Sequence, residues 1–386
     1  MKPLSQLRAV HVVGIGLHPY QRPSATTYVE LGLHAVRAAL DDAGIAWTSV
    51  ESAYTGTAMV GMAASRPLFR HLGGTGIPMA QVENASASGS TAFRQAVIEV
   101  ASGLSDVTLA LGVDKPDRVS GAASKTGIGS LVTRSTPPAA FFAMLADQYR
   151  DRTGATVEQI ARVAVKNSRN GAANPFAQRR KLRTLEEVLA PPFIAGCLTR
   201  LQCCPIGEGA AAVLVASDEA IDKMGLARER AVRVLCSISR SETPASPGED
   251  GDSVLTRSTA QQAYEETGLG PMDLDVVEVH DAFSIEELLY AEALGLVGPG
   301  EAAGALEASA FDIGGRVALS PSGGLLSMGH PLGPTGLGQI AEITLQLRGE
   351  AGRRQQPEAR TGLAHMVGAG SVCLIHILRA PETFRP

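Results

Sequence analysis

A run of small and hydroxyl residues, Asn84-Ala85-Ser86-Ala87-Ser88-Gly89-Ser90, lies just before a helical pattern that is clear from Phe93 onward. Small side chains let a backbone come close to a ligand, and the N–H groups at the start of a helix can hold an anion or a developing oxyanion. These features are typical of a loop that presents a nucleophile, and Ser86 stands in the nucleophile's place. The same pattern is also typical of serines that only cap a helix.

Three segments from the second half of the chain carry histidines that can complete such a site. His280 follows an expected strand, and His330 stands between a glycine and a proline at a helix entrance. His365 comes shortly before the glycine turn that begins at Gly368. Each histidine taken singly can be structural. Together, a hydroxyl at a helix start, two or three histidines and a turn that supplies N–H donors indicate acyl transfer.

Length, composition and charge limit the class of protein. The chain has 386 residues, which is enough for two or three domains with a large core. Its net charge of −5 gives no indication of nucleic acid or an anionic membrane as a partner, and 42 glycines suit closely packed helix-on-sheet layers. The five cysteines lack paired spacing, so neither a disulfide framework nor a metal site is indicated. No leader and no apolar run of about 18 residues is apparent, and we expect a cytoplasmic protein.

Apolar periodicity predicts alternating strands and helices in both halves of the chain. A strand at 11–16, a helix at 28–43, a helix near 61–71 and a strand at 107–111 indicate an α/β unit of about 115 residues. Helix-like segments near 139–151 and 156–170 indicate an inserted cap. The later pattern of a helix ending at Gly268 and a strand at 276–280 repeats the earlier pattern of a helix ending at Gly44 and a strand at 50–56. We therefore predict two related halves.

A series of short motifs follows between about residues 84 and 370. They are Ser88-Gly89-Ser90-Thr91-Ala92, Lys166-Asn167, Asn174-Pro175-Phe176, Leu201-Gln202-Cys203-Cys204-Pro205, His280-Asp281-Ala282-Phe283, Pro321-Ser322-Gly323-Gly324, Gly329-His330-Pro331-Leu332-Gly333 and His365-Met366-Val367-Gly368. In this order they resemble the thiolase superfamily, of the sterol-carrier-protein type. The resemblance implies a duplicated α/β fold in five layers, α/β/α/β/α, with an inserted cap. Residues 1–115 would form the N-terminal half, to which 209–225 return, 116–208 the cap, and 226–386 the C-terminal half.

The resemblance also implies a homodimer that acts on a coenzyme A thioester. Thiolases break or make the carbon–carbon bond β to the thioester: one cysteine takes the acyl group and a second moves the α-proton. Ser86 stands where the acyl-accepting cysteine would be, and His330 would be its base. His280 would line the oxyanion hole for the enolate. The N–H groups of Ser86 and Gly368 would hold the tetrahedral oxyanion, with His365 beside that turn.

Basic residues gather in the expected cap. Between residues 161 and 183 there are seven basic residues and no acidic one. We expect Arg179, Arg180, Lys181 and Arg183 to attract the phosphates of coenzyme A, although such a run is also typical of a solvated face or of a surface for an acidic partner. The motif that contains Ser322 and Gly323 adds two further expected contacts with coenzyme A. The resemblance also allows a small companion protein with a zinc ribbon and an OB fold.

Two departures from the thiolase pattern leave the reaction open. The nucleophile is serine, and Ala282 and Met366 occupy the places from which the family supplies its second cysteine. A serine hydroxyl, unlike a thiol, must lose its proton to a base in step with its attack. The chain can therefore be a Cys-to-Ser form of a thiolase for a bulky 3-oxoacyl-CoA. It can instead be a retro-aldolase for a CoA thioester that needs no nucleophile, or a non-catalytic acyl-CoA-binding subunit of a complex.

Overall fold

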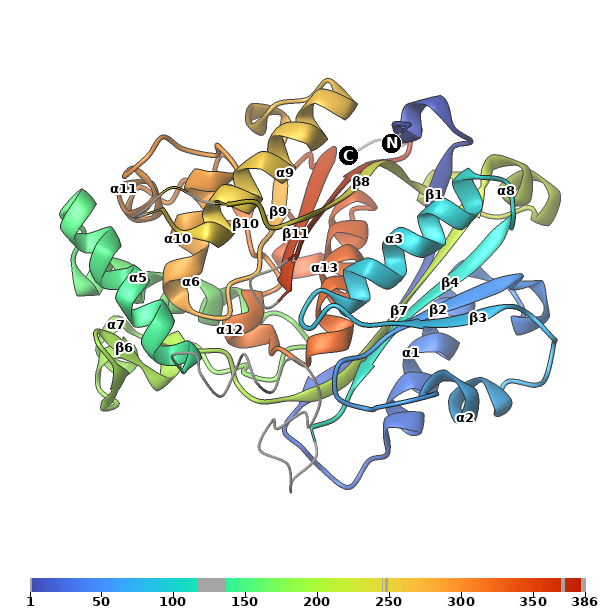
Figure 1. The fold of residues 1–386 in the computed structure, drawn as a ribbon, viewed down its shortest axis with the longest axis horizontal. Helices are drawn as coiled ribbons and strands as arrows, with labels where there is room; N and C mark the ends of the chain where they lie inside the picture. Colours follow the sequence, from blue (N-terminus) through green and yellow to red (C-terminus); the bar gives the residue numbers. More distant parts are fainter. Residues whose placement is uncertain (1, 117–136, 245, 247–248, 369–371, 383–386) are drawn as a thin grey trace.

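The structure, a computed structural model, describes residues 2–116, 137–244, 246, 249–368 and 372–382. Two helices, α3 (Ser88–Ala101) and α13 (Leu332–Leu347), pack against each other at the centre, with strands on both sides (Figure 1). Helix α1 (Tyr28–Ala43) covers the strands of the N-terminal half, while α9 (Gly251–Thr267) and α10 (Ser284–Ala293) cover those of the C-terminal half. This layering confirms the α/β/α/β/α order expected from the sequence.

Ten strands pair side by side, and each half of the chain contributes five neighbouring strands. The strands of the first half are β1 (Val10–Gln21), β2 (Ser52–Gly56), β3 (Met79–Val82), β4 (Val107–Asp114) and β7 (Glu208–Ser217). Those of the second half are β8 (Val232–Ser241), β9 (Val276–Glu278), β10 (Ala318–Leu319), β11 (Thr361–Gly368) and β12 (Val372–Arg379). The order is β10-β9-β11-β12-β8-β1-β7-β4-β2-β3. The two five-stranded groups join where His11 pairs with Arg233 and Val12 with Val232.

The two halves repeat one topology. In the first half β2 pairs in parallel with β3 and β4, and β7 pairs antiparallel with β4 and β1. In the second half β9 pairs in parallel with β10 and β11, and β12 pairs antiparallel with β11 and β8. Strand β7 follows the cap in sequence but lies between β1 and β4, so the chain returns to its first half. The predicted duplicated α/β fold is confirmed.

Local sequence explains where the first helices begin and end. Thr27 and Glu30 form a reciprocal capping box at the start of α1, and Gly44 ends the helix in the left-handed conformation, with a φ of 70°. The predicted helix at 28–43 is therefore confirmed. Helix α2 (Ser65–Arg70) is shorter than the predicted 61–71, because Gly61 and Ala63 have φ values of 86° and 58°, which no α-helix contains. A short helix, α8 (Asp218–Met224), follows β7.

The central helices approach each other through glycine. A Cβ atom on Gly89 would collide with the carbonyl oxygen of Gly333, and a Cβ on Gly112 would meet the same carbonyl at 2.5 Å. Only hydrogen fits at these positions, so the start of α3 and the start of α13 lie close together. Helix α13 begins at Leu332, directly after Pro331. This close approach brings the loop before α3 next to the loop before α13.

The described part of the cap lies between β4 and β7 in sequence and rests on the C-terminal half. It contains α5 (Pro138–Thr153), α6 (Val157–Ala172), α7 (Leu185–Leu189) and the paired strands β5 (Phe193–Ala195) and β6 (Leu198–Thr199). Helix α6 contacts α10, α11 (Ala302–Glu307) and α12 (Gly324–Met328) (Figure 1). The predicted cap helices near 139–151 and 156–170 are confirmed. The glycine- and serine-rich start of the expected cap, residues 117–136, lies outside the described residues.

Candidate active site

Ser86 lies at the tip of a tight loop before α3. Ala85 has a φ of 48°, an uncommon conformation for a residue with a side chain. The Ser88 hydroxyl fixes the loop, because it accepts the Asn84 N–H at 2.9 Å and donates to the Ala85 carbonyl at 2.7 Å. Ser88 is thus the serine that holds the loop together. Ser86 is half-buried, and its hydroxyl faces the loop of the other half.

The Ser86 hydroxyl contacts a histidine that is 244 residues away in the chain. Ser86 Oγ lies 3.1 Å from His330 Nε2, and His330 Nδ1 lies 2.9 Å from Thr335 Oγ1. Thr335 donates its own proton to the Pro331 carbonyl at 2.6 Å. The hydroxyl of Thr335 must therefore accept the Nδ1–H of His330, which leaves Nε2 with a lone pair for the Ser86 proton. This is the tautomer that a general base requires.

Burial also keeps His330 neutral. The surrounding protein removes water from its ring and lowers the pKa of His330 well below its usual 6.5, and the neighbouring His280 lowers it further. The ring centroids of His280 and His330 are 5.1 Å apart, with the planes nearly perpendicular. A neutral imidazole beside a hydroxyl can take the hydroxyl proton during attack. The predicted pair of Ser86 and His330 is brought together by the structure.

A buried carboxylate of the N-terminal half holds the His330 loop. Asp114, at the end of β4, accepts the backbone N–H of Gly333 at 2.6 Å and that of Met59 at 2.8 Å. It also accepts the hydroxyl of Thr57 at 2.7 Å. Burial raises the pKa of Asp114, and these donors oppose the shift. Sequence reasoning missed Asp114, whose position at the carboxyl end of a strand was the available signal.

His280 uses one ring nitrogen to bind a buried glutamate. Its Nδ1 lies 3.1 Å from Glu286 Oε1, and the other carboxylate oxygen accepts the Phe283 N–H at 2.8 Å. The side chain is nine-tenths buried, and Nε2 has no hydrogen-bond partner among the described residues. Because Nδ1–H donates to the carboxylate, Nε2 is a lone pair when the ring is neutral and a donor when it is charged. The expected oxyanion-hole role therefore requires the protonated ring.

His365 lies behind His280. Its Nδ1 accepts the His280 backbone N–H at 3.4 Å, its Nε2 lies 2.9 Å from Thr256 Oγ1, and its ring packs against Tyr290. Burial lowers the pKa of His365 to about 3, so the ring stays neutral. These contacts use both nitrogens of a fully buried ring. The structure thus places His365 as a support of the His280 backbone, and not among the groups that face Ser86.

Gly368 lies against the Ser86 loop. A Cβ atom at this position would collide with the Asn84 carbonyl oxygen and would come within 3.0 Å of Ala87. Only glycine lets the end of β11 come this close. The structure therefore brings Gly368 to the predicted neighbourhood of Ser86. Residues 369–371, which complete the expected glycine turn, lie outside the described residues.

A buried polar network fixes the loop that carries His280. Asn167, on α6, donates to Asp281 at 2.7 Å and to Glu287 at 2.9 Å, and Lys166 pairs with Glu287 at 3.2 Å. Burial raises the pKa of both acids, and Lys166 opposes the rise. Both the Lys166-Asn167 motif and the His280-Asp281 motif had been singled out in the sequence. Their contact explains why these motifs occur together: α6 holds the loop of His280.

No thiol of the described residues contacts Ser86 or the two histidines. Cys203 and Cys204 lie in the wall of a neighbouring pocket, where burial raises their pKa to about 11 and about 12. Cys373 is buried on β12, and burial raises its pKa to about 12 as well. All three thiols are therefore protonated near neutral pH. In the protonated form none of them is a ready nucleophile or base.

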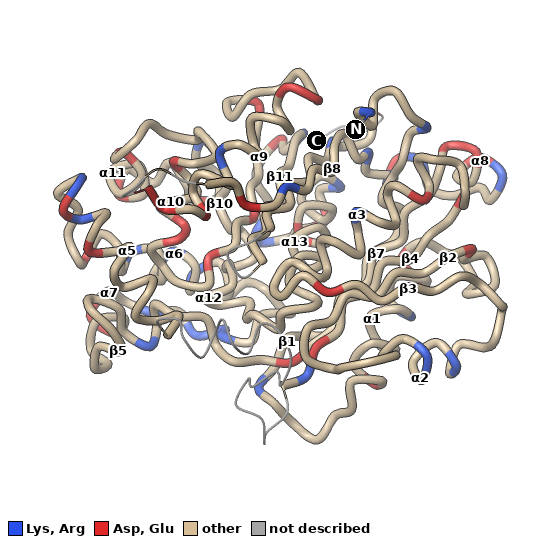
Figure 2. The backbone as a smooth tube through the Cα atoms, viewed as in Figure 1, with Lys and Arg blue, Asp and Glu red and all other residues tan. Residues whose placement is uncertain are grey.

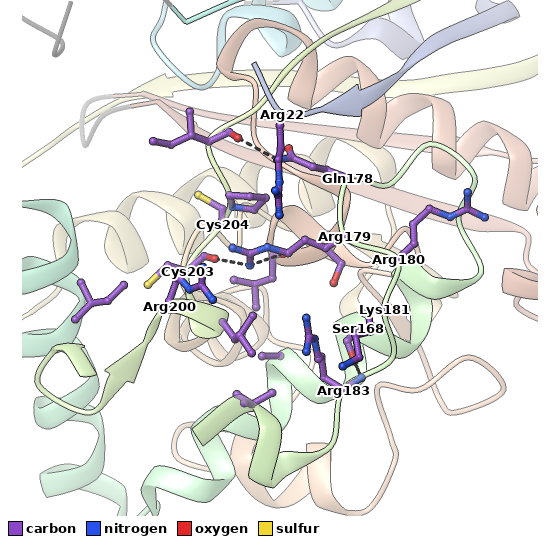
Figure 3. A pocket seen from close by; sticks show the side chains of 18 of the residues that line it. Arg22, Ser168, Gln178, Arg179, Arg180, Lys181, Arg183, Arg200, Cys203 and Cys204 are labelled. Carbon is purple, nitrogen blue, oxygen red and sulfur yellow. Dashed lines mark hydrogen bonds between the residues drawn. The ribbon is translucent and has the colours of Figure 1, made fainter. Parts of the chain in front are cut away.

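A cationic pocket of about 730 Å³ is lined by residues of α6, α12 and the segments 178–183 and 200–206 (Figure 3). Its lining includes six cations, Arg22, Arg179, Arg180, Lys181, Arg183 and Arg200, and no acidic residue. Lys181 and Arg183 share Glu187, at 2.8 and 3.6 Å. No described residue forms an ion pair with Arg22, Arg180 or Arg200. The four predicted cap cations are brought together, whereas Arg22 and Arg200 were missed. Figure 2 shows that several basic positions lie near α12.

Backbone hydrogen bonds tie this pocket to both histidine loops. Arg179 N–H donates to the Ser327 carbonyl at 2.9 Å, three residues before His330. On the opposite wall, Cys204 N–H donates to the Ala282 carbonyl at 2.8 Å, two residues after His280. The Arg179 guanidinium joins the two walls, because it donates to the carbonyls of Cys203 at 2.8 Å and Leu326 at 3.1 Å (Figure 3). The walls of the pocket are thus joined by backbone hydrogen bonds to the two loops that carry the histidines.

Ser322 and Gly323 do not line this pocket. The Ser322 hydroxyl and N–H both donate to Glu278, at 2.8 and 2.9 Å, and the side chain is buried. Gly323 has a φ of 101°, and a Cβ atom there would meet the backbone of Gly171 at 2.7 Å. The structure therefore uses this motif for a tight turn against α6. Their positions away from the pocket do not support the expected contacts with coenzyme A.

The described residues contain no group of histidine, cysteine and acidic side chains arranged to hold a metal ion. Among the same residues, no helix is both long enough and apolar enough to cross a membrane.

Comparisons with known proteins agree with this geometry. The family model described as "Thiolase, N-terminal domain" matches residues 20–219, and "Thiolase C-terminal domain-like" matches residues 247–379. Benzoylsuccinyl-CoA thiolase subunit BbsB of Thauera aromatica is 38% identical, over 94% of this chain and 95% of that protein. Human sterol carrier protein 2 is 35% identical, over 97% of this chain and 72% of that protein. A solved structure described as "Ltp2-ChsH2(DUF35) aldolase" superposes with a TM-score of 0.84 at 26% identity, over 97% of this chain and 99% of that one. The chain belongs to the thiolase family.

Proposed function

We propose that this protein cleaves or forms the carbon–carbon bond β to the thioester of a bulky 3-oxoacyl-CoA, with Ser86 as the acyl acceptor. The observation that carries this proposal is the 3.1 Å contact between Ser86 Oγ and the unprotonated Nε2 of His330. A hydroxyl whose proton points at a fixed, neutral imidazole can attack a carbonyl without a thiolate. Thiolysis of the substrate, or the reverse condensation, is the reaction.

The steps follow from the positions of these groups. Ser86 Oγ attacks the 3-oxo carbon while His330 Nε2 takes its proton, and the oxyanion is held by the N–H groups of Ser86 and Gly368. The bond to C2 then breaks, and its electron pair becomes the enolate of the departing thioester. That carbon takes up a proton, and coenzyme A removes the acyl group from Ser86, which regains its proton from His330.

The cationic pocket is the proposed site for the phosphates of coenzyme A. Six cations line the pocket, and three of them, Arg22, Arg180 and Arg200, have no ion-pair partner among the described residues, so the pocket attracts a polyanion. Guanidinium groups bind phosphate oxygens in pairs. The pocket walls end at the loops of His280 and His330, so a thioester attached to a phosphate-bound nucleotide can reach the site. This arrangement supports Arg179, Arg180, Lys181 and Arg183 as contacts, with Arg22 and Arg200 added.

Similarity to the benzoylsuccinyl-CoA thiolase subunit supports a bulky, aromatic acyl group. The same relative is named a subunit, and the described aldolase structure names a second protein, a DUF35 protein. We therefore include in the proposal a small companion with a zinc ribbon and an OB fold, bound to a homodimer of this chain. Neither nucleic acid nor a membrane is part of the proposal.

Retro-aldol cleavage of a 3-hydroxyacyl-CoA is the second candidate. It is favoured because no described thiol forms a hydrogen bond with Ser86, and by the similarity to a structure described as an aldolase. This reaction needs a base for the hydroxyl group and stabilisation of the enolate, but no acyl acceptor. A subunit that binds acyl-CoA without turnover is the non-enzymatic alternative.

Substitutions at position 86 separate these functions. With benzoylsuccinyl-CoA and free coenzyme A, Ser86→Ala should reduce thiolysis by at least about 100-fold, and Ser86→Cys should raise it more than about 10-fold, because a thiolate is the better nucleophile. Acetoacetyl-CoA serves as the small comparison substrate. With a 3-hydroxyacyl-CoA as substrate, undiminished cleavage in Ser86→Ala, with release of an aldehyde or ketone and no need for free coenzyme A, would establish the aldolase instead. Binding of coenzyme A without turnover in all three forms would support the binding subunit.

A further inference from the structure

The pair of His280 and Glu286 has no task in the steps that Ser86 and His330 perform. Its position is nevertheless within the site, because the His280 ring lies 5.1 Å from the ring of His330. Glu286 is 1% exposed, and α10 places it so that one carboxylate oxygen faces His280 Nδ1 and the other caps the helix at Phe283. A buried carboxylate held by three donors, the third being the Tyr290 hydroxyl at 3.3 Å, is rarely only a helix cap.

The free nitrogen of His280 points to a proton transfer. Nε2 is buried and has no partner among the described residues, although buried polar atoms are normally paired. A substrate atom in the site can supply the missing partner. The proposed reaction has one proton still to place, at C2 of the departing enolate, and Ala282 and Met366 occupy the two places where the family's second thiol would be.

We infer that His280 carries the proton to and from C2 of the thioester, and that Glu286 is the positioning residue that stabilises the charged form of His280. This inference rests on the proposed function, which it completes. In the cleavage direction the enolate carbon takes the Nε2 proton of charged His280 and forms the C2–H bond, leaving His280 neutral. The thiol of the incoming coenzyme A then gives its proton to His280, and its thiolate takes the acyl group from Ser86. The serine leaves with the proton held by His330, so both histidines return to their starting states.

Other charged or titratable groups face this pair. Burial raises the pKa of Glu286, and the neighbouring His280 and the Phe283 N–H oppose the shift. Tyr290 lies on the same helix, His365 on β11, His330 before α13, and Asp252 on α9. Burial raises the pKa of Asp252 to about 7. Asp252 can therefore affect the pH dependence of the exchange rate near neutral pH, and a separate variant must control for this effect.

Exchange of the C2 protons of acetyl-CoA for deuterons in D2O tests the inference without any acyl transfer. The unaltered protein should exchange them, as read by mass spectrometry, and Glu286→Gln should slow the exchange by about 10- to 100-fold. The carbonyl oxygen of glutamine can still accept from His280 Nδ1, but the negative charge that stabilises the ring once Nε2 has taken a proton is removed. The acid limb of the pH–rate profile should accordingly move to lower pH by at least about one unit. The KM for acetyl-CoA should stay within about twofold.

Matched variants make the result decisive. Glu292→Gln changes a half-buried acid of α10, which binds the Tyr149 hydroxyl, and should leave exchange as it is. Glu286→Asp should recover part of the exchange rate. In a protein that also carries Asp252→Asn, Glu286→Gln should still move the acid limb of the pH–rate profile to lower pH. Exchange in Glu286→Gln within twofold of the unaltered protein, an unmoved limb, or no exchange in the unaltered protein would overturn the inference. Ser86→Ala separates the two proposals, because acyl transfer needs the serine hydroxyl, whereas exchange at C2 needs no acyl acceptor.

Discussion

The Thr335 hydroxyl provides the sharpest test of the proposed base. The contact of 2.9 Å with His330 Nδ1 and the 2.6 Å bond to the Pro331 carbonyl together select the tautomer that accepts the Ser86 proton. Thr335→Val keeps the shape of the side chain but removes the acceptor of Nδ1–H. The ring is then free to carry its proton on Nε2, where it points at Ser86 Oγ and cannot act as a base.

The expected magnitude follows from one buried hydrogen bond. A net contribution of about 1 to 1.5 kcal/mol is lost, and each 1.4 kcal/mol corresponds to about a tenfold change in an equilibrium or a rate. The rate of Ser86 acylation should therefore fall by about 5- to 12-fold in Thr335→Val. Thr335→Ser, which retains the hydroxyl, should stay within about twofold of the unaltered protein. The midpoint temperature of thermal unfolding should change little in either variant, because the new side chain remains buried and has nearly the volume of threonine.

Two measurements check this expectation. Single-turnover acylation with a 3-oxoacyl-CoA, read by the mass of the intact protein, gives the rate. Nitrogen-15 chemical shifts of histidine-labelled protein, with His330 assigned by its loss in His330→Asn, give the tautomer. Equal acylation rates in the valine and serine variants would refute the tautomer argument, even if both proteins were folded.

Two further predictions concern the pH dependence of stability and the cationic pocket. Burial, and then the nearby Glu342, raise the pKa of Glu278 to about 8, so the folded state binds its proton more tightly than the unfolded state and stability falls as the pH rises from about 5 to 8. Glu278→Gln should reduce that fall by an amount on the order of 3 kcal/mol, measured as unfolding free energy in denaturant at each pH. Arg22→Ala or Arg200→Ala should weaken the binding of coenzyme A about 3- to 10-fold. Neither change should weaken the binding of an acyl-pantetheine, which lacks the nucleotide. As a control, Arg353→Ala, which alters an exposed arginine, should leave the binding of both ligands unchanged. Titration calorimetry measures both, and equal losses for the two ligands would contradict a phosphate contact.

The sequence allowed the fold to be predicted, and it indicated Ser86 and His330, which the structure brings together, because these signals are local. Alternating apolar periods indicate strands and helices, and glycines beside Ser86 and His330 mark loops that approach a ligand. The pairing of these two residues across the chain depended on recognising the duplication. The repeated strand order, which places both loops at the start of the two central helices, then supplied the geometry.

The partners of the reacting groups were harder to predict because their sequence signals have ordinary explanations. Glu286 occupies the third position of α10, where a glutamate is a common helix cap, and the structure shows that it caps Phe283 as well as binding His280. Thr335 lies in the first turn of α13, where threonine is common and does not by itself indicate a functional contact. The motif with Ser322 and Gly323 shows a further difficulty, because small residues in a row indicate that a backbone is approached closely but do not identify the neighbour. Here the neighbour is α6 and not a ligand.

The two histidines of the site differ chiefly in what binds their Nδ1 atoms. His330 donates to a neutral hydroxyl in a buried setting, which leaves the ring uncharged and its Nε2 ready to accept a proton from Ser86. His280 Nδ1 instead lies 3.1 Å from the Glu286 carboxylate, which in the inferred proton transfer stabilises the ring when Nε2 carries a proton. Two identical side chains within 5.1 Å can therefore serve as base and acid at one pH. Exchanging the partners, with a carboxylate behind His330 and a neutral amide behind His280, would remove both functions while leaving each imidazole in place.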